Sequence, residues 1–66
     1  MVLRDRNLRK TFTRLSDYGV RLFLDGRPVT PRQLSLKLVR GRERYSPGFV
    51  YSKEGNLSEL NYVRLA

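Results

Sequence analysis

Alternation of apolar and polar residues is clearest at residues 20–24, where every second side chain, from Val20 to Leu24, is apolar. A period of two is typical of a β-strand that buries one face. Residues 9–15 have three β-forming residues, Thr-Phe-Thr, near their centre, and we predict a strand there too. The residues of the intervening segment 16–19 are typical of a turn, so the simplest arrangement is an antiparallel pair of strands.

Turn chemistry marks the end of this predicted pair. The dipeptide Asp25-Gly26 is a strong hairpin signal, and Pro28 cannot donate the hydrogen bond that further ladder pairing needs. Residues 1–7 are charged without periodicity, and we predict a flexible arm or a short edge strand for them.

The segment 29–41 has the boundary signals of a helix. Thr30 and Gln33 match a capping box, and Pro31 stands at the first helical position, where no N–H is needed. Gly41 stands where a glycine ends a helix, and most residues between these limits are good helix formers. We therefore predict a helix in this segment.

The same segment also carries the pattern of a strand. Leucines at positions 34, 36 and 38 alternate strictly, whereas in a helix Leu36 points away from the other two. If residues 33–40 are a strand, the chain becomes an all-β, five-stranded barrel of the SH3-like kind.

The last third of the chain predicts a second hairpin. Residues 42–48 are expected to form a loop, because Pro47-Gly48 is the strongest turn dipeptide in the chain. Residues 49–52 and 57–65 are predicted to be strands with a turn between them.

These elements predict an α+β fold, with one short helix across a small antiparallel sheet of four strands in the order ββαββ. No segment resembles a linker, so residues 1–66 are expected to form a single small basic domain. A domain of this size buries only about 60% of the surface that its unfolded chain exposes. A homodimer is therefore an attractive way to add stability.

Cysteine and histidine are both absent from the sequence. Disulfides and thiolate metal sites are therefore excluded, together with the commonest nitrogen ligand of metal ions. Small secreted domains usually carry disulfides, so this composition favours a cytoplasmic location. The N-terminus has no apolar signal-peptide core, and the longest apolar run is three residues, so no membrane association is expected.

Catalysis is not expected. Without His or Cys, an active site needs paired carboxylates, a lysine nucleophile or a Ser-Lys arrangement, and the six acids lie mostly in predicted turns or beside arginines. The five glycines are spread singly along the chain, so there is no glycine-rich phosphate loop, and no cofactor is expected.

Charge is the most informative property of the chain. Fourteen Lys and Arg residues against six Asp and Glu give a net charge of +8. Residues 1–44 hold 12 basic and 4 acidic residues, whereas residues 45–66 hold two of each. A surface with this asymmetry attracts polyanions and holds their phosphates with release of counterions.

Two groups of residues are the main candidates for contact with a polyanion. The first is a run of cations near the N-terminus, which either follows phosphates and enters a minor groove or protects an edge strand by its charge: Arg4, Arg6, Arg9, Lys10 and Arg14. The second combines arginines that neutralise a backbone with a ring that can stack on bases: Arg40, Arg42, Arg44 and Tyr45.

Arg32 and Lys37 form a third basic group on the predicted helix, either in contact with nucleic acid or as part of an ordinary polar face. Phe49 and Tyr51 share a strand face and are expected to pack in the core.

The hypothesis that follows is a small nucleic-acid-binding accessory or regulatory protein that contacts phosphates of DNA or RNA through an arginine-rich face. The alternative is a protein-interaction module or inhibitor that docks its basic face on an acidic partner. The two differ in their response to salt, because phosphate contacts weaken log-linearly as salt rises.

Overall fold

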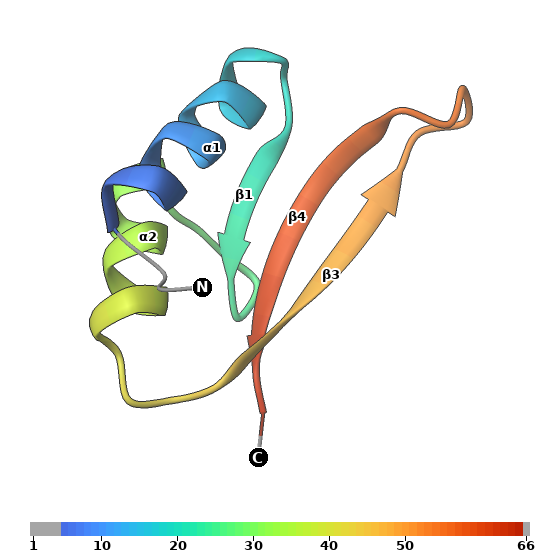
Figure 1. Cartoon of the computed structure of the whole chain (residues 1–66). Coiled ribbons are helices and arrows are strands. Elements are labelled where there is room, and N and C mark those ends of the chain that lie inside the picture. Colours follow the sequence, from blue (N-terminus) through green and yellow to red (C-terminus); the bar gives the residue numbers. More distant parts are fainter. Residues whose placement is uncertain (1–4, 66) are drawn as a thin grey trace.

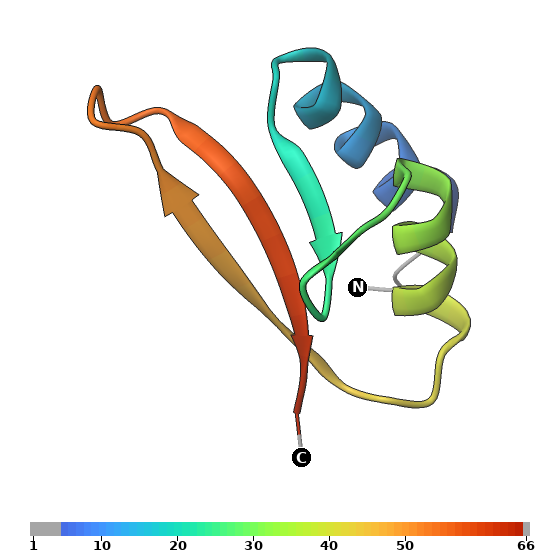
Figure 2. The same cartoon turned by 180° about the vertical axis from the view of Figure 1, so that it is seen from behind.

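A computed structural model describes residues 5–65, with side chains described from residue 7 onward. Along these residues the elements are α1 (Asp5–Asp17), β1 (Arg21–Leu24), β2 (Arg27–Pro28), α2 (Pro31–Arg40), β3 (Tyr45–Tyr51) and β4 (Leu57–Arg64). The strands form one sheet in the order β2-β1-β4-β3. The helices pack against each other and against β1, while β3 lies at the far edge of the sheet (Figure 1). From behind, the β3–β4 hairpin extends beyond the helices (Figure 2).

The α+β class is confirmed, and the elements from β1 to β4 follow the predicted order ββαββ. The all-β barrel is wrong, because residues 31–40 are helical and the sheet of residues 21–64 is open. The sheet is mixed, since β1 pairs parallel with β4 and antiparallel with β2. The predicted fully antiparallel sheet is therefore wrong, because β1 lies next to β4, which is far from it in sequence.

The predicted strand at residues 9–15 is wrong, because this segment lies inside α1. Leu8, Phe12 and Leu15 stand at positions i, i+4 and i+7, so they share one helix face. Phe12 is buried, and the two leucines pack against the same core. The burial of this stripe outweighs the modest β-propensity of the Thr-Phe-Thr run. Residues 1–4 of the predicted arm lie outside the described residues.

The turn predicted at residues 16–19 is corrected: residues 16 and 17 belong to α1, and the turn at residues 18–19 joins this helix, not a strand, to β1. The Gly19 N–H donates to the Ser16 carbonyl at 3.0 Å, and the Val20 N–H donates to the Leu15 carbonyl at 3.0 Å. This pair of bonds is the Schellman motif, which requires the positive φ of +89° found at Gly19. Leu15 and Val20 both join the core, so the turn sends the chain from α1 straight into β1.

The Asp25-Gly26 hairpin is also confirmed. Both residues have positive φ, +51° and +80°, as a type I′ turn requires. The Asp25 carboxylate accepts a hydrogen bond from the Arg64 N–H at 2.8 Å, and the Gly26 N–H donates to the Asn61 side-chain oxygen at 3.1 Å. The turn between β1 and β2 is thereby fastened to β4.

The helix predicted at residues 29–41 is confirmed as α2, with both bonds of the capping box. The Gln33 N–H donates to the Thr30 hydroxyl at 3.1 Å, and the Thr30 N–H donates to the Gln33 side chain at 2.9 Å. Gly41 ends the helix with a φ of −70°, outside the left-handed region. Glycine is required there for steric reasons, because a Cβ at Gly41 would collide with the Lys37 carbonyl oxygen.

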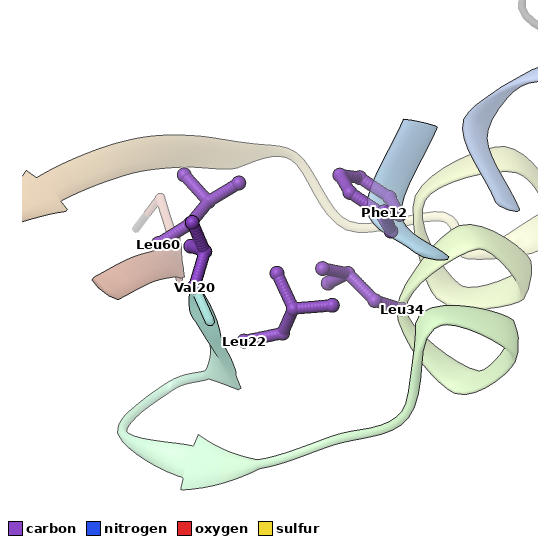
Figure 3. Close-up of a cluster of buried hydrophobic side chains, with 5 residues drawn as sticks. All are labelled: Phe12, Val20, Leu22, Leu34 and Leu60. Atoms are coloured by element: carbon purple, nitrogen blue, oxygen red, sulfur yellow. The ribbon is translucent and has the colours of Figure 1, made fainter. Parts of the chain in front are cut away.

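The buried core lies between the helices and strands β1 and β4 (Figure 3). It consists of Phe12, Val20, Leu22, Leu34 and Leu60, each at most 6% exposed. Each fully buried aliphatic or aromatic side chain contributes about 1.5–3 kcal/mol of transfer free energy. The core thus fixes both helices on one face of the sheet.

The predicted second hairpin is confirmed, with a correction to its first strand. Residues 45–48 belong to β3, so Pro47-Gly48 is not a turn. Proline is tolerated because β3 is an edge strand. The expectation that Phe49 and Tyr51 are core residues is wrong, since they are 53% and 61% exposed. Their strand lies beyond the reach of the helices that bury the corresponding residues of β4.

Candidate functional site

The outer face of α1 carries three of the predicted cations. Arg9, Lys10 and Arg14 are all exposed, and Lys10 and Arg14 lie on the side of the helix opposite buried Phe12. They line a shallow hollow with Thr13 and Asp17. Lys10 and Arg14 are one helical turn apart, so their like charges repel each other slightly in the free protein. An anion at this hollow would relieve that repulsion.

The outer face of α2 carries the next three. Arg32, Lys37 and Arg40 are exposed, while Leu34 and Ser35 on the opposite side are buried. Lys37 and Arg40 line a shallow surface with Gln33. No acidic residue occurs in α2, so this stripe has no carboxylate of its own to neutralise it.

The segment between α2 and β3 adds Arg42 and Arg44, both exposed, beside the single carboxylate of Glu43. Tyr45 does not join them as a free ring. It is half-buried and lines a hollow with Leu8, Leu38 and Tyr62. The predicted combination of arginines with a stacking ring is therefore not assembled here, and Tyr45 is better described as a packing residue.

These cations all lie on the two helices or on the segment that follows α2, and we call them together the helix-layer surface. Because α1 and α2 pack against each other and bury their opposite faces, their outer faces lie in one layer of the molecule (Figure 1). It comprises Arg9, Lys10, Arg14, Arg32, Lys37, Arg40, Arg42 and Arg44. Arg4 and the side chain of Arg6 lie outside the described residues.

The sheet carries almost none of the excess charge. In residues 7–65 the helices and the segment 41–44 hold eight cations and two carboxylates, a net charge of +6. The rest of this range holds four cations and three carboxylates, a net charge of +1. The field of the molecule is therefore strongest over the helix layer, where it attracts polyanions.

The cations of the helix-layer surface form no ion pairs with carboxylates of the described residues. Within residues 7–65 the one ion pair joins Arg21 of β1 to Glu59 of β4, with 3.9 Å between nitrogen and oxygen. The pair lies on the sheet, and such exposed pairs stabilise by at most about 1 kcal/mol. The eight cations of the helix-layer surface thus remain available to a partner.

Other kinds of site do not appear in the described part of the chain. Residues 7–65 contain no group of three potential metal-ligating side chains. Neither described helix has the length and apolar character needed to cross a bilayer. Burial raises the pKa of the Tyr62 hydroxyl, and the Tyr62 ring packs against Phe12.

Sequence reasoning found the cations but not the surface that they share. Arg9, Lys10 and Arg14 were assigned to an arm and a strand, whereas they lie on a helix next to the cations of α2. The spacing of Leu8, Phe12 and Leu15 was the signal that could have placed them there.

Comparisons with known proteins add no relative. No protein-family model matches the chain, and no curated protein or solved structure is significantly similar to it.

Proposed function

We propose that the protein binds nucleic acid through the helix-layer surface. The observation that supports this function is the concentration of charge: eight unpaired cations with two carboxylates over the helices and segment 41–44. Exposed Lys and Arg side chains in such numbers can neutralise several phosphates of a duplex, and this neutralisation releases counterions.

The contacts proposed are mainly with the sugar-phosphate backbone. None of the eight residues of the helix-layer surface is aromatic, Tyr45 packs in a hollow, and Phe49 and Tyr51 lie on β3. One exposed ring, Tyr18, lies beside this surface, at the end of α1 one helical turn after Arg14. Backbone contacts position a protein on nucleic acid but carry little sequence information. We therefore expect weak sequence preference, and stronger binding to duplexes than to single strands.

Two double variants with equal total charge test the proposal. Lys37→Glu with Arg40→Glu reverses two charges of the helix-layer surface, whereas Arg27→Glu with Lys53→Glu reverses two exposed charges outside it. We expect the first pair to lower duplex affinity about tenfold or more. The slope of log affinity against log salt concentration should also become shallower, by about 0.9 for each phosphate contact that is lost. The second pair should have a much smaller effect.

Fluorescence anisotropy with duplex DNA, single-stranded DNA and duplex RNA measures these affinities at several salt concentrations. Equal losses in the two double variants would show that only net charge matters and would contradict the proposed site. Absence of binding to all three at about 50 mM salt would reject nucleic acid as the ligand and leave the acidic protein partner as the alternative.

A further inference from the structure

Most of the exposed apolar residues belong to the hairpin of β3 and β4. Of the six large apolar side chains exposed in residues 7–65, all but Tyr18 belong to β3, β4 or the residue after β4. We call this group the hairpin patch: Phe49, Val50, Tyr51, Val63 and Leu65. Side chains alternate along a strand, so Phe49 and Tyr51 lie on one face of the hairpin and Val50 lies on the other, and both faces of the β3 edge are apolar.

The outer edge of β3 is open to a further strand. The Leu65 N–H donates to the Arg44 carbonyl, whereas the Arg64 N–H and the Tyr62 carbonyl bond on the β1 side. Bonding direction alternates along an antiparallel ladder, so the residues opposite Tyr62 and Arg64 direct their backbone groups outward. With the register of the hairpin, these outward residues are Tyr45, Pro47, Phe49 and, beyond the bulge, Tyr51.

Charge restricts what can meet this edge. Residues 45–66 hold two cations and two carboxylates, whereas residues 1–44 carry the net charge of +8. Two copies of such a chain repel each other wherever their helix layers approach. The neutral, apolar hairpin is the part of the described surface where a second copy can dock without this electrostatic repulsion. It also has no net charge that would attract an acidic or a basic peptide.

We propose that the chain forms a two-fold symmetric dimer in which β3 pairs antiparallel with β3 of a second copy, with Phe49 at the axis. In this register the two Phe49 residues exchange N–H to carbonyl hydrogen bonds. Tyr51 faces Pro47 of the second copy on one face of the sheet, and Val50 faces Gly48 on the other. The rings of Phe49 and Tyr51 then cover each other's exposed surface.

Pro47 fits this register. Its nitrogen has no hydrogen to donate, but its outward carbonyl accepts from the Tyr51 N–H of the second copy. The proline therefore removes one donor from each strand and disfavours registers that place Pro47 at the axis, where both missing donors meet. An edge proline commonly guards against indiscriminate pairing, and in this register the two missing donors lie on either side of the axis, away from the central Phe49 pair.

The dimer has a defined shape. The two-fold axis is perpendicular to the sheet. The joined sheet therefore has eight strands, in the order β2-β1-β4-β3 in one copy followed by β3-β4-β1-β2 in the second. Helices of both copies then lie on one face of the joined sheet, and the two helix-layer surfaces face the same side. This arrangement does not depend on nucleic acid, although it would present two basic surfaces to one duplex if the proposed function holds.

Sedimentation equilibrium of the full chain from about 10 to 500 µM tests the dimer. We expect a concentration-dependent dimer that tightens as salt is added, because salt screens the repulsion between the two basic copies. This response is opposite in sign to that of phosphate binding, so the two proposals fail separately. A chain that stays monomeric over this range at about 0.5 M salt would overturn the dimer.

Phe49→Lys places two like charges at the axis, and we expect it to raise the dissociation constant of the dimer about tenfold or more. Tyr18→Lys is the matched control, because Tyr18 is 81% exposed but lies at the end of α1, far from β3 in the fold. Circular dichroism checks that both variants keep the fold. Equal dimerisation of Phe49→Lys and the natural chain would contradict the proposed interface.

The register itself can be tested by cross-linking, since the chain has no cysteine. Cα atoms of a hydrogen-bonded antiparallel pair lie about 5.5 Å apart, within the range that a disulfide spans. A Phe49→Cys variant should therefore form a covalent dimer rapidly under mild oxidation, and Tyr18→Cys should not. A Phe49→Cys variant that links no faster than Tyr18→Cys would overturn the placement of Phe49 at the axis.

Discussion

The ring of Phe12 in α1 meets the ring of Tyr62 in β4 edge to face, with centroids 5.9 Å apart and planes inclined at 74°. Such edge-to-face pairs contribute about 0.5–1.5 kcal/mol beyond the area that they bury. The contact joins the first helix to the last strand. The contact therefore joins residues near the two ends of the chain in one core. The local sequence pattern predicts a strand at Phe12, whereas the residue lies on a helix.

Phe12→Ala is expected to lower the free energy of unfolding by about 3–5 kcal/mol. The substitution removes the ring contact with Tyr62 and leaves a cavity among the five buried residues of the core. A domain of this size has only about 3–5 kcal/mol in total, so much of the variant should be unfolded at room temperature. Urea titration followed by circular dichroism measures the loss, and Thr13→Ala, at an exposed neighbour, should change stability much less.

Tyr62 should make stability depend on alkaline pH. Burial raises the pKa of its hydroxyl above the ordinary 10.0, so the unfolded chain loses this proton first as the pH rises. The contribution of Tyr62 is complete below about pH 10 and is lost as the pH rises through the pKa of the folded state. Tyr62→Phe should show a smaller decrease in the free energy of unfolding between about pH 8 and pH 11 than the natural chain.

The comparison rests on the slope of stability against pH, because Tyr62→Phe also changes the absolute stability. Tyr18→Phe is the control, because it removes the same hydroxyl from a tyrosine that is 81% exposed and lies outside the core. Identical slopes for the natural chain and Tyr62→Phe would show that the hydroxyl does not couple to folding.

Local signals were sufficient for the parts of the fold that are held by local hydrogen bonds. The capping box of Thr30 and Gln33 and the Asp25-Gly26 turn are each complete within four residues, and both were predicted correctly. The parallel pairing of β1 with β4 joins Leu22 to Leu60, and nothing near either residue specifies it. Such pairing is decided by the packing of both strands under the helices.

The candidate site was likewise predictable only in part from local sequence. Composition identified Arg9, Lys10 and Arg14 as candidates, but their common surface with Lys37 and Arg40 depends on α1 packing against α2. Pro47 was taken as a turn residue because the sequence does not reveal that β3 has an open edge, where a missing N–H is tolerated.

Substitutions at Gly41 should be costly for a reason that differs from that at Gly19. At Gly41 a Cβ collides with the backbone of Lys37, whereas at Gly19 there is open space and the constraint is a φ of +89°. Asparagine accepts the left-handed conformation better than other residues, so Gly19→Asn should cost little. Gly41→Asn should destabilise by about 1–3 kcal/mol, as overpacking does.

Thermal unfolding of the two asparagine variants distinguishes these causes. Similar melting temperatures for Gly19→Asn and Gly41→Asn would contradict the distinction between conformational and steric demand. An equally stable Gly41→Ala variant would show that the end of α2 can relax away from the carbonyl of Lys37.

The capping box of α2 should contribute measurably to stability and to the order of the helix-layer surface. Thr30→Ala removes the acceptor for the Gln33 N–H, and we expect it to cost about 1 kcal/mol, while Thr30→Ser keeps the acceptor and should cost less. Gln33→Ala removes the reciprocal bond to the Thr30 N–H. Because both bonds close the same turn, the Thr30→Ala and Gln33→Ala effects should be less than additive in the double variant. Urea titrations of the four variants measure this coupling, and strict additivity would show that the two bonds act independently.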